Sequence, residues 1–372
     1  MIPRATSLAM PILDLDANAT EPLRPPARDA MLAALAVGGN PSSVHGGGRA
    51  ARHVVEQARG VVAGRFGGEV VFTSGGTEAS ALALHGLSQG VNQERRILAG
   101  ATEHAAVLAA AGPRQAELLP VHRDGTLDLD ALRAALRGPP ALVCAMAANN
   151  ETGVLHPLAE IAALCREAGA ILHVDGVQAA RLHDSFDADS VALSAHKLGG
   201  APGAGALVLR AGLRLRPLIA GGGQERGLRG GTEAVPAIAA FAAAVEAPYA
   251  AARLAGLRDA IEAGLGEGVT IAGRNAPRLP NTTMLILPGV PAETQVIALD
   301  LAGIRVSAGA ACSSGKVARS HVLAAMGFGE AAGCGIRVSL PWNAPDDAPA
   351  RFLDAYAAMR ARLSSRRLAR AT

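Results

Sequence analysis

Lysine and aromatic side chains are the scarcest features of this chain of 372 residues. Lysine occurs only at Lys197 and Lys316, although lysine and arginine together number 35. Any chemistry that needs a side-chain amine therefore has two candidates. Aromatic residues make up 2% of the chain, so the core must be built from alanine, valine, leucine and isoleucine. The hydrophobic content of 50% is enough for a sizeable core, and the length favours two domains.

The cysteines and the charge exclude several classes of protein. The four cysteines form no CxxC pair and no zinc-finger spacing, which argues against a zinc module or a disulfide framework and suits a reducing cytosol. A net charge of +3 gives no reason to expect binding to nucleic acid or to a membrane. The most apolar segment, 235–245, is about half the length of a membrane span, and we expect no signal peptide. The sequence therefore predicts a cytoplasmic protein.

Apolar runs alternate with stretches rich in alanine and leucine over the first two-thirds of the chain. Strand-like runs lie at 70–72, 141–144, 171–174 and 206–209. This alternation predicts an α/β fold with a mostly parallel sheet covered by helices, and places functional residues where strands end. After the glycine-rich stretch 221–231, the remainder is typical of a smaller α+β domain. The expected domains are 12–250 and 251–372, with the N-terminal segment packing against the smaller one.

A first motif follows the strand-like run at 70–72. Gly76 and Thr77 stand where a helix is expected to begin. The free amides of a helix start attract a phosphate, glycine lets the backbone approach it, and the threonine hydroxyl adds a donor. An ordinary strand–turn–helix junction with a threonine cap would have the same residues, so this motif alone leaves both interpretations open.

Two further motifs suggest an aldehyde cofactor. Asp175 follows the run at 171–174, where its carboxylate can pair with the pyridine nitrogen of pyridoxal phosphate or cap a helix. Lys197 lies 22 residues later, in the segment Ser194-Ala195-His196-Lys197. Its amine can form a Schiff base with an aldehyde, and Ser194 and His196 can donate to a phosphate. A solvated surface lysine is the alternative, which the rarity of lysine in this chain disfavours.

The pattern Asp175-x-x-Gln178 followed by Ser194-x-His196-Lys197 resembles the cofactor site of cysteine desulfurases of the NifS/IscS type. These are class V aminotransferase-like pyridoxal-phosphate enzymes, and the resemblance implies fold-type I. It covers nearly the whole chain. Further similar segments occur, in the family's order, at 15–20, 40–45, 102–104, 149–153, 221–227, 231–232, 309–315 and 336–340. Two departures, Ala79-Ser80-Ala81 and Pro341, remove no residue with an implied role.

The resemblance implies how the cofactor ring would be held. Lys197 resembles the lysine that binds the cofactor covalently and then removes a proton from the substrate. His104 is similar to the histidine that stacks on the ring, and is a candidate proton carrier. Asp175 would bind the ring nitrogen and Gln178 the phenolic oxygen, while Asn150 would lie between that oxygen and the substrate carboxylate.

The resemblance also implies the partners of the phosphate and of the substrate. Thr77, Ser194, His196 and the Gly76 amide would hold the phosphate. Thr232 resembles a threonine that reaches the phosphate of a second subunit, which implies a homodimer. Arg337 resembles the arginine that binds the substrate carboxylate, and a guanidinium fork suits a carboxylate better than an ammonium does.

Cys312 distinguishes this reaction from plain transamination. It lies among small residues in 307–315, which we expect to form an exposed, mobile loop. A thiolate is the reactive form of cysteine, and Lys316 could assist it, although a solvated lysine is the simpler interpretation. Cys144, Cys165 and Cys334 are interpreted as structural residues, because free cysteine is usually a small buried hydrophobe.

The resemblance therefore implies a cysteine desulfurase that converts L-cysteine to L-alanine and holds the sulfur as a persulfide on Cys312. An acceptor protein would take it, such as an iron–sulfur scaffold, or it would serve tRNA thiolation. No resident metal is implied, and a transient iron–sulfur cluster would contact Cys312. A selenocysteine lyase, another class V enzyme and a non-catalytic sulfur-transfer scaffold remain alternatives. The arginine-rich end, 360–370, is either a patch for an acidic partner or a solvated helix face.

Overall fold

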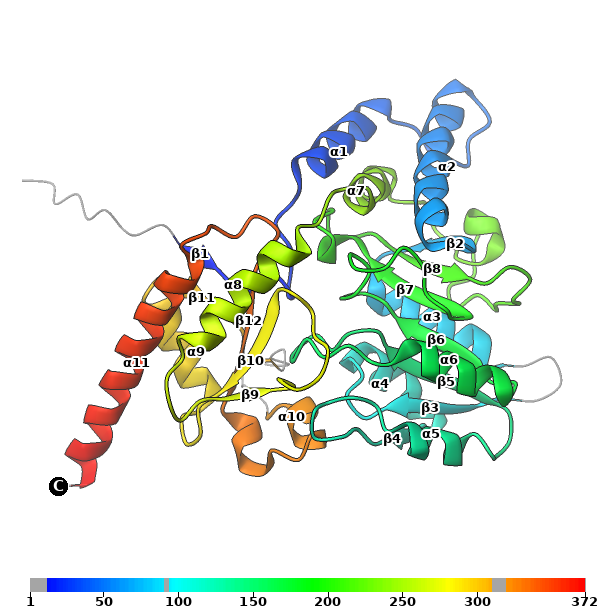
Figure 1. Ribbon diagram of the computed structural model, residues 1–372. Helices are drawn as coiled ribbons and strands as arrows, with labels where there is room; N and C mark the ends of the chain where they lie inside the picture. The colour runs from blue at the N-terminus through cyan, green and yellow to red at the C-terminus, as the bar shows by residue number, and fades with distance from the viewer. Residues whose placement is uncertain (1–11, 90–93, 310–318, 372) are drawn as a thin grey trace, which may run out of the picture.

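The computed structural model describes residues 12–89, 94–309 and 319–371. It contains a larger body built on a seven-stranded sheet and a smaller body built on a three-stranded sheet (Figure 1). The large sheet has the order β2 (Glu69–Thr73), β8 (Gly205–Leu209), β7 (Ser190–Ser194), β6 (Ile171–Asp175), β5 (Ala141–Met146), β3 (Arg96–Gly100) and β4 (Glu117–Leu119). Strand β8 runs antiparallel to its neighbours β2 and β7, and the other pairs are parallel. The predicted mixed, mostly parallel sheet is confirmed.

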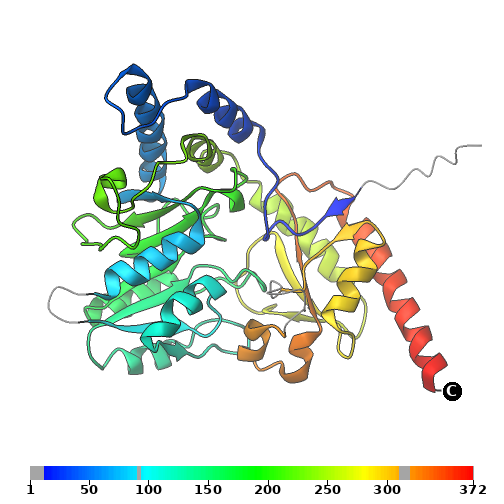
Figure 2. The same ribbon diagram turned by 180° about the vertical axis from the view of Figure 1, so that it is seen from behind.

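Helices cover both faces of this sheet, because its central strands are apolar on both sides. Every residue of β5 and β6 is buried, as expected for inner parallel strands. One face packs against α3 (Gly76–Ser88) and α4 (Ala105–Ala111), which lie in front of the sheet in Figure 2. The opposite face packs against four helices: α2 (Gly46–Phe66), α5 (Leu129–Ala135), α6 (Leu158–Glu167) and α7 (Val235–Val245). Helix α1 (Pro25–Val37) packs on α2 and α7.

The smaller body has its own core. Its antiparallel sheet has the order β12 (Gly335–Ser339), β10 (Thr282–Ile286) and β9 (Thr270–Ala272). It packs with four helices: α8 (Ala251–Ala263), α9 (Ala292–Asp300), α10 (His321–Ala325) and α11 (Ala348–Ala371). Short 3-10 helices occupy Gly112–Arg114, Ala195–Lys197, Gln224–Gly227 and Gly329–Gly333. Two of the rare aromatic residues, Phe352 and Tyr356, stack in this core with ring centroids 5.4 Å apart.

The N-terminal segment lies with the smaller body. Strand β1 (Leu13–Asp14) pairs in parallel with β11 (Ile304–Arg305), and Asp16 bridges to Ser339 at the end of β12. From there the chain crosses to α1 on the larger body, as Figure 1 shows. The division after residue 250 falls between α7 and α8, and it stays a prediction. No helix in the part of the chain that the structure describes is long and apolar enough to cross a membrane.

Candidate active site

A cavity of about 490 Å³ opens where the carboxyl ends of β6 and β7 face the smaller body. Ten predicted site residues line it: Gly76, Thr77, His104, Asn150, Asp175, Gln178, Ser194, His196, Lys197 and Arg337. Thr232 does not line the cavity and is exposed. Cys312 lies outside the described residues, but Ser307 and Gly309, shortly before it in the chain, are part of the cavity wall.

One end of the cavity is suited to an anion. Helix α3 begins at Gly76, where an added Cβ would lie 2.6 Å from Val177 Cγ2, so glycine allows the close approach of helix and loop. The preceding glycine has no side chain to cap the helix, which leaves first-turn amides for a ligand. The Thr77 and Ser194 hydroxyls adjoin this end. Burial, and secondarily Lys197, lower the pKa of His196 to about 4, so its ring is neutral at pH 7.

The carboxylate of Asp175 lies in the same cavity, at the carboxyl end of β6. Asp175 is buried, and the Val177 N–H donates to its Oδ1 at 3.0 Å. Burial raises the pKa of Asp175, and the Val177 N–H, His104 and Lys197 oppose that change. A positive group that also offered a hydrogen to this carboxylate would favour its ionised form. A protonated pyridine nitrogen is such a group.

A second acid, Glu103, lies nearby and is also buried. Its Oε1 accepts the Met146 N–H at 2.6 Å. Burial and the charge of Asp175 raise the pKa of Glu103 well above its usual range. Both effects favour the neutral form of Glu103.

Lys197 and His104 also line the cavity. Burial, and secondarily Arg337, lower the pKa of Lys197 to about 8, which increases the share of neutral, nucleophilic amine. His104 caps α4 by accepting the Ala106 N–H on Nδ1 at 3.1 Å. Desolvation within the cavity, opposed by Asp175, lowers the pKa of His104, although the ring still reaches solvent. Its Nδ1 is therefore an acceptor, and a neutral ring carries its proton on Nε2.

Arg337 provides a buried cation on the wall formed by the smaller body. Its Nη2 lies 2.5 Å from Asp16 Oδ1, and its Nη1 donates to the Asn150 carbonyl at 3.0 Å. Its Nε is buried and has no partner among the described residues. The guanidinium is thus held in place at the cavity, with its Nε–H unpaired among the described residues.

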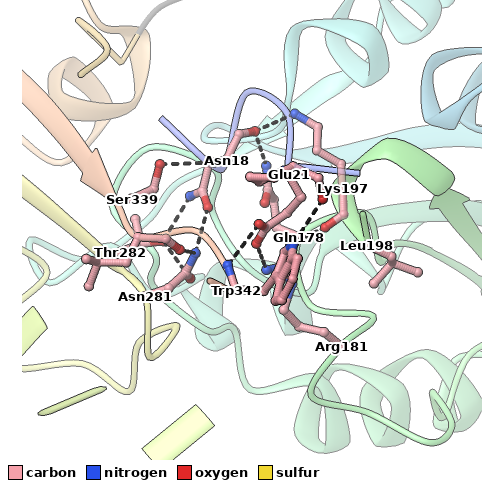
Figure 3. Close-up of polar contacts among 12 residues, drawn as sticks. Asn18, Glu21, Gln178, Arg181, Lys197, Leu198, Asn281, Thr282, Ser339 and Trp342 are labelled. Carbon is pink, nitrogen blue, oxygen red and sulfur yellow. Dashed lines mark hydrogen bonds and ion pairs between the residues drawn. The ribbon is translucent and has the colours of Figure 1, made fainter. Parts of the chain in front are cut away.

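The N-terminal segment crosses the cavity at Asn18. Lys197 Nζ donates to the carbonyls of Asn18 and Ala19, and Gln178 Nε2 donates to the Asn18 carbonyl at 3.0 Å. Figure 3 shows Lys197 and Gln178 pointing toward Asn18. The Asn18 side chain donates to the Asn150 carbonyl at 3.1 Å and to Thr282 Oγ1 at 2.9 Å, so one residue links the lysine loop to the smaller body.

These residues fit pyridoxal phosphate. The cavity combines an anion cradle at the start of α3, a carboxylate for a ring nitrogen, an amine of lowered pKa and an adjacent imidazole. Arg337 adds a binding group for a carboxylate on the substrate side. The predicted residues therefore meet in one place, with Cys312 undescribed and Thr232 elsewhere.

Sequence reasoning missed Asp16, Asn18 and Glu103 as site residues. All three lie in segments that carry the resemblance, 15–20 and 102–104, but none received a role. For Asp16 and Asn18, the signal that could have identified them is a polar residue inside a short, mostly apolar motif, because such a residue must find a partner when buried.

Comparison with known proteins agrees with this arrangement. The family model for class-V aminotransferases matches residues 14–347. A cysteine desulfurase of Cereibacter sphaeroides is 42% identical over 84% of this chain and 86% of its own length. Cysteine desulfurase 2 of Trichormus variabilis is 40% identical over 86% of this chain and 85% of its own. The X-ray structure of a NifS-like protein from Rickettsia africae superposes with a TM-score of 0.86 at 31% identity, covering 94% of this chain and 99% of that one.

These matches confirm the resemblance seen in the motifs and the expected fold-type I architecture. The chain therefore belongs to the class-V aminotransferases and, among them, to the cysteine desulfurase family, whose members depend on pyridoxal phosphate.

Proposed function

We propose that this protein takes sulfur from L-cysteine, releases L-alanine and holds the sulfur as a persulfide on Cys312. The observation that carries the proposal is the position of the segment leading to Cys312. Ser307 and Gly309 line the same cavity as Lys197 and Arg337. A thiol three residues beyond Gly309 is within reach of a substrate held there, since each residue of extended chain spans about 3.3 Å.

Pyridoxal phosphate, when bound, supplies an aldehyde for the substrate amine and withdraws electrons from the substrate carbons. The protein supplies the remaining functions. Arg337 binds and orients the substrate carboxylate. Lys197 Nζ accepts the proton from the substrate Cα, and the lowered pKa of this amine suits a base near neutral pH. Asp175 would pair with a protonated ring nitrogen, which would favour the ionised form of this carboxylate.

The sulfur transfer itself requires a thiolate. Cys312 Sγ forms a bond to the substrate sulfur while the bond between that sulfur and the substrate Cβ breaks, and the electron pair leaves with carbon. Protonation at Cβ completes L-alanine. His104 Nε2 and the Lys197 ammonium are the groups in the cavity that can deliver this proton. No outside oxidant is needed, because one sulfur atom moves from cysteine, which becomes alanine, to the Cys312 thiol, which becomes a persulfide.

We further propose that the enzyme works as a homodimer in which Thr232 serves the neighbouring subunit. Thr232 follows a loop fixed by a buried ion pair between Arg59 and Glu225, 2.8 Å apart, and Glu225 also accepts the Phe72 N–H. Thr232 is exposed on this fixed loop, away from its own cavity. The acceptor protein and the cytoplasmic location stay predictions.

The test compares Cys312→Ser with the matched variant Cys334→Ser. The Cys312 variant should bind pyridoxal phosphate with an unchanged visible spectrum but should form neither sulfide nor alanine from L-cysteine. Cys334→Ser should retain both products. Full turnover by Cys312→Ser would contradict the assignment of the nucleophile. Assays for selenide and keto-acid products in the wild-type enzyme separate this function from a selenocysteine lyase or a transaminase.

A further inference from the structure

The arginine assigned to the substrate carboxylate is already paired within the protein. Arg337 has a side chain only 5% exposed, and its Nη2 lies 2.5 Å from Asp16 Oδ1. Its Nη1 donates to the Asn150 carbonyl at 3.0 Å, which leaves Nε without a partner among the described residues. The Asp16 carboxylate therefore already occupies a site at Nη2, a nitrogen that a ligand carboxylate would also use.

The geometry of arginine brings the Asp16 carboxylate and a substrate carboxylate to the same nitrogen. A carboxylate binds a guanidinium bidentately through Nη1 and Nη2 or through Nε and Nη2. Both modes use Nη2. Each Nη carries two N–H groups, so a substrate carboxylate that binds Arg337 must either displace the Asp16 oxygen or lie beside it at Nη2, where the two negative charges repel each other.

Asp16 is placed so that it can release the arginine. Its side chain is 29% exposed, whereas that of Arg337 is almost fully buried. Its backbone is held independently of this ion pair, because the Asp16 N–H donates to Asp14 Oδ1 at 3.0 Å and Asp16 bridges to Ser339. The side chain can therefore turn toward water while the segment stays in place.

We propose that Asp16 is a specificity-determining residue that competes with the substrate carboxylate for Arg337. The competition weakens binding of every ligand that carries a carboxylate and leaves ligands without one unaffected. It thereby lets the enzyme release its product, which keeps the same carboxylate as the substrate. This inference rests on the proposed role of Arg337 and goes beyond it by explaining what the arginine does before substrate arrives.

The test measures binding by calorimetry with the pyridoxal-phosphate-loaded enzyme, which requires no turnover. In Asp16→Asn the amide keeps the volume of the acid and removes its charge. We expect the dissociation constant of L-alanine to fall by about three- to tenfold, the range of a partly exposed ion pair lost as a competitor. L-Alaninamide, which lacks the carboxylate, should bind with an unchanged or weaker affinity. The KM for L-cysteine should fall along with the constant for L-alanine.

The matched control is Asp14→Asn, which removes the same charge two residues away. Asp14 has a half-exposed side chain and pairs with Arg305 at 3.7 Å rather than with Arg337. It should bind both ligands as the wild type does. Asp16→Ala provides a second variant in case the amide perturbs the segment, and it should change affinity in the same direction.

Weaker binding of L-alanine by both Asp16 variants would overturn the proposal, because it would mean that Asp16 orients the arginine for the substrate. Equal gains in affinity for L-alanine and L-alaninamide would also overturn it, and so would an unchanged affinity for both ligands. Wild-type enzyme that binds L-alanine no better than L-alaninamide would refute the role of Arg337 and this inference together. Wild-type enzyme that binds L-alanine but forms no sulfide would contradict only the proposed function.

Discussion

At the residue scale, two histidines outside the cavity are held neutral by their surroundings. Burial lowers the pKa of His156 to about 4, although Asp124 opposes it, and burial lowers the pKa of His173 to about 3. His156 Nδ1 accepts the Leu127 N–H at 3.1 Å, and His173 Nε2 is buried with no partner among the described residues. Protonation of either ring would place a positive charge in a buried site, which is unfavourable.

Acid should therefore destabilise the fold. The pKa of these histidines is about 6.5 in the unfolded chain, and it is lower in the fold. Between about pH 6.5 and pH 4 the unfolded chain binds more protons, so the free energy of unfolding falls as pH falls. The fall is about 1.4 kcal/mol per pH unit for each histidine. Urea unfolding at several pH values measures this slope.

The variant His156→Asn isolates the contribution of one histidine to the pH dependence of stability, because the asparagine Oδ1 can still accept the Leu127 N–H. Its free energy of unfolding should depend less steeply on pH than that of the wild type, by the slope of one histidine. His53 is exposed, so His53→Asn should leave the slope unchanged. Parallel curves for His156→Asn and wild type would show that this ring does titrate in the fold.

At the element scale, the start of α3 determines how closely a phosphate can approach the sheet. The first turn of the helix lies against the loop after β6, and an added Cβ on Gly76 would lie 2.6 Å from Val177 Cγ2 and 3.4 Å from Ser194 Cβ. An added Cβ there must displace the Val177 side chain or move the start of the helix away from it. The anion cradle thus depends on a residue that contributes only its backbone.

Gly76→Ala should therefore weaken cofactor binding. Overpacking of this kind costs about 1–3 kcal/mol, so the dissociation constant of pyridoxal phosphate should rise by about tenfold or more. Absorbance titration of the cofactor-free protein measures it. Gly64→Ala in α2, where an added Cβ meets no atom within 4 Å, should not change this constant. Equal constants for Gly76→Ala and wild type would refute the role given to the helix start.

At the scale of the whole molecule, the cavity is completed by parts of the chain that are distant in sequence. Arg337 and the segment 16–19 come from the smaller body, whereas Lys197 and Asp175 end strands of the larger sheet. The proposed dimer would add Thr232 from a second copy. Each subunit would then depend on its neighbour for one phosphate ligand.

This dependence predicts that two defective variants repair each other. Lys197→Ala should have no activity, and Thr232→Ala should bind pyridoxal phosphate more weakly and turn over slowly at limiting cofactor. In a mixed dimer, one site combines Lys197 from one subunit with Thr232 from the other. Co-expression in equal amounts should restore wild-type behaviour to about one quarter of all sites. Activity no higher than the average of the two variants would show that Thr232 serves its own subunit.

Sequence reasoning predicted the parts of the site that follow directly from strand order. Asp175 ends β6 and Lys197 closely follows the end of the adjacent parallel strand β7, so their meeting follows from the alternation of strands and helices. The partners of Asn18 could not be predicted in this way, because Asn150 and Thr282 reach it only after the two bodies pack together. The raised pKa of Glu103 likewise depends on its burial beside Asp175, which no local pattern encodes.

The pairing of β1 with β11 has a consequence for how the protein is made. Leu13 pairs with Ile304, so this strand must wait for a partner that is synthesised much later. The large sheet contains none of these residues and can form while synthesis continues. The pocket, however, lacks Ser307, Gly309 and Arg337 until residues 304–339 emerge, so nascent chains stalled before that point should fold their sheet yet lack the arginine proposed to bind the substrate carboxylate.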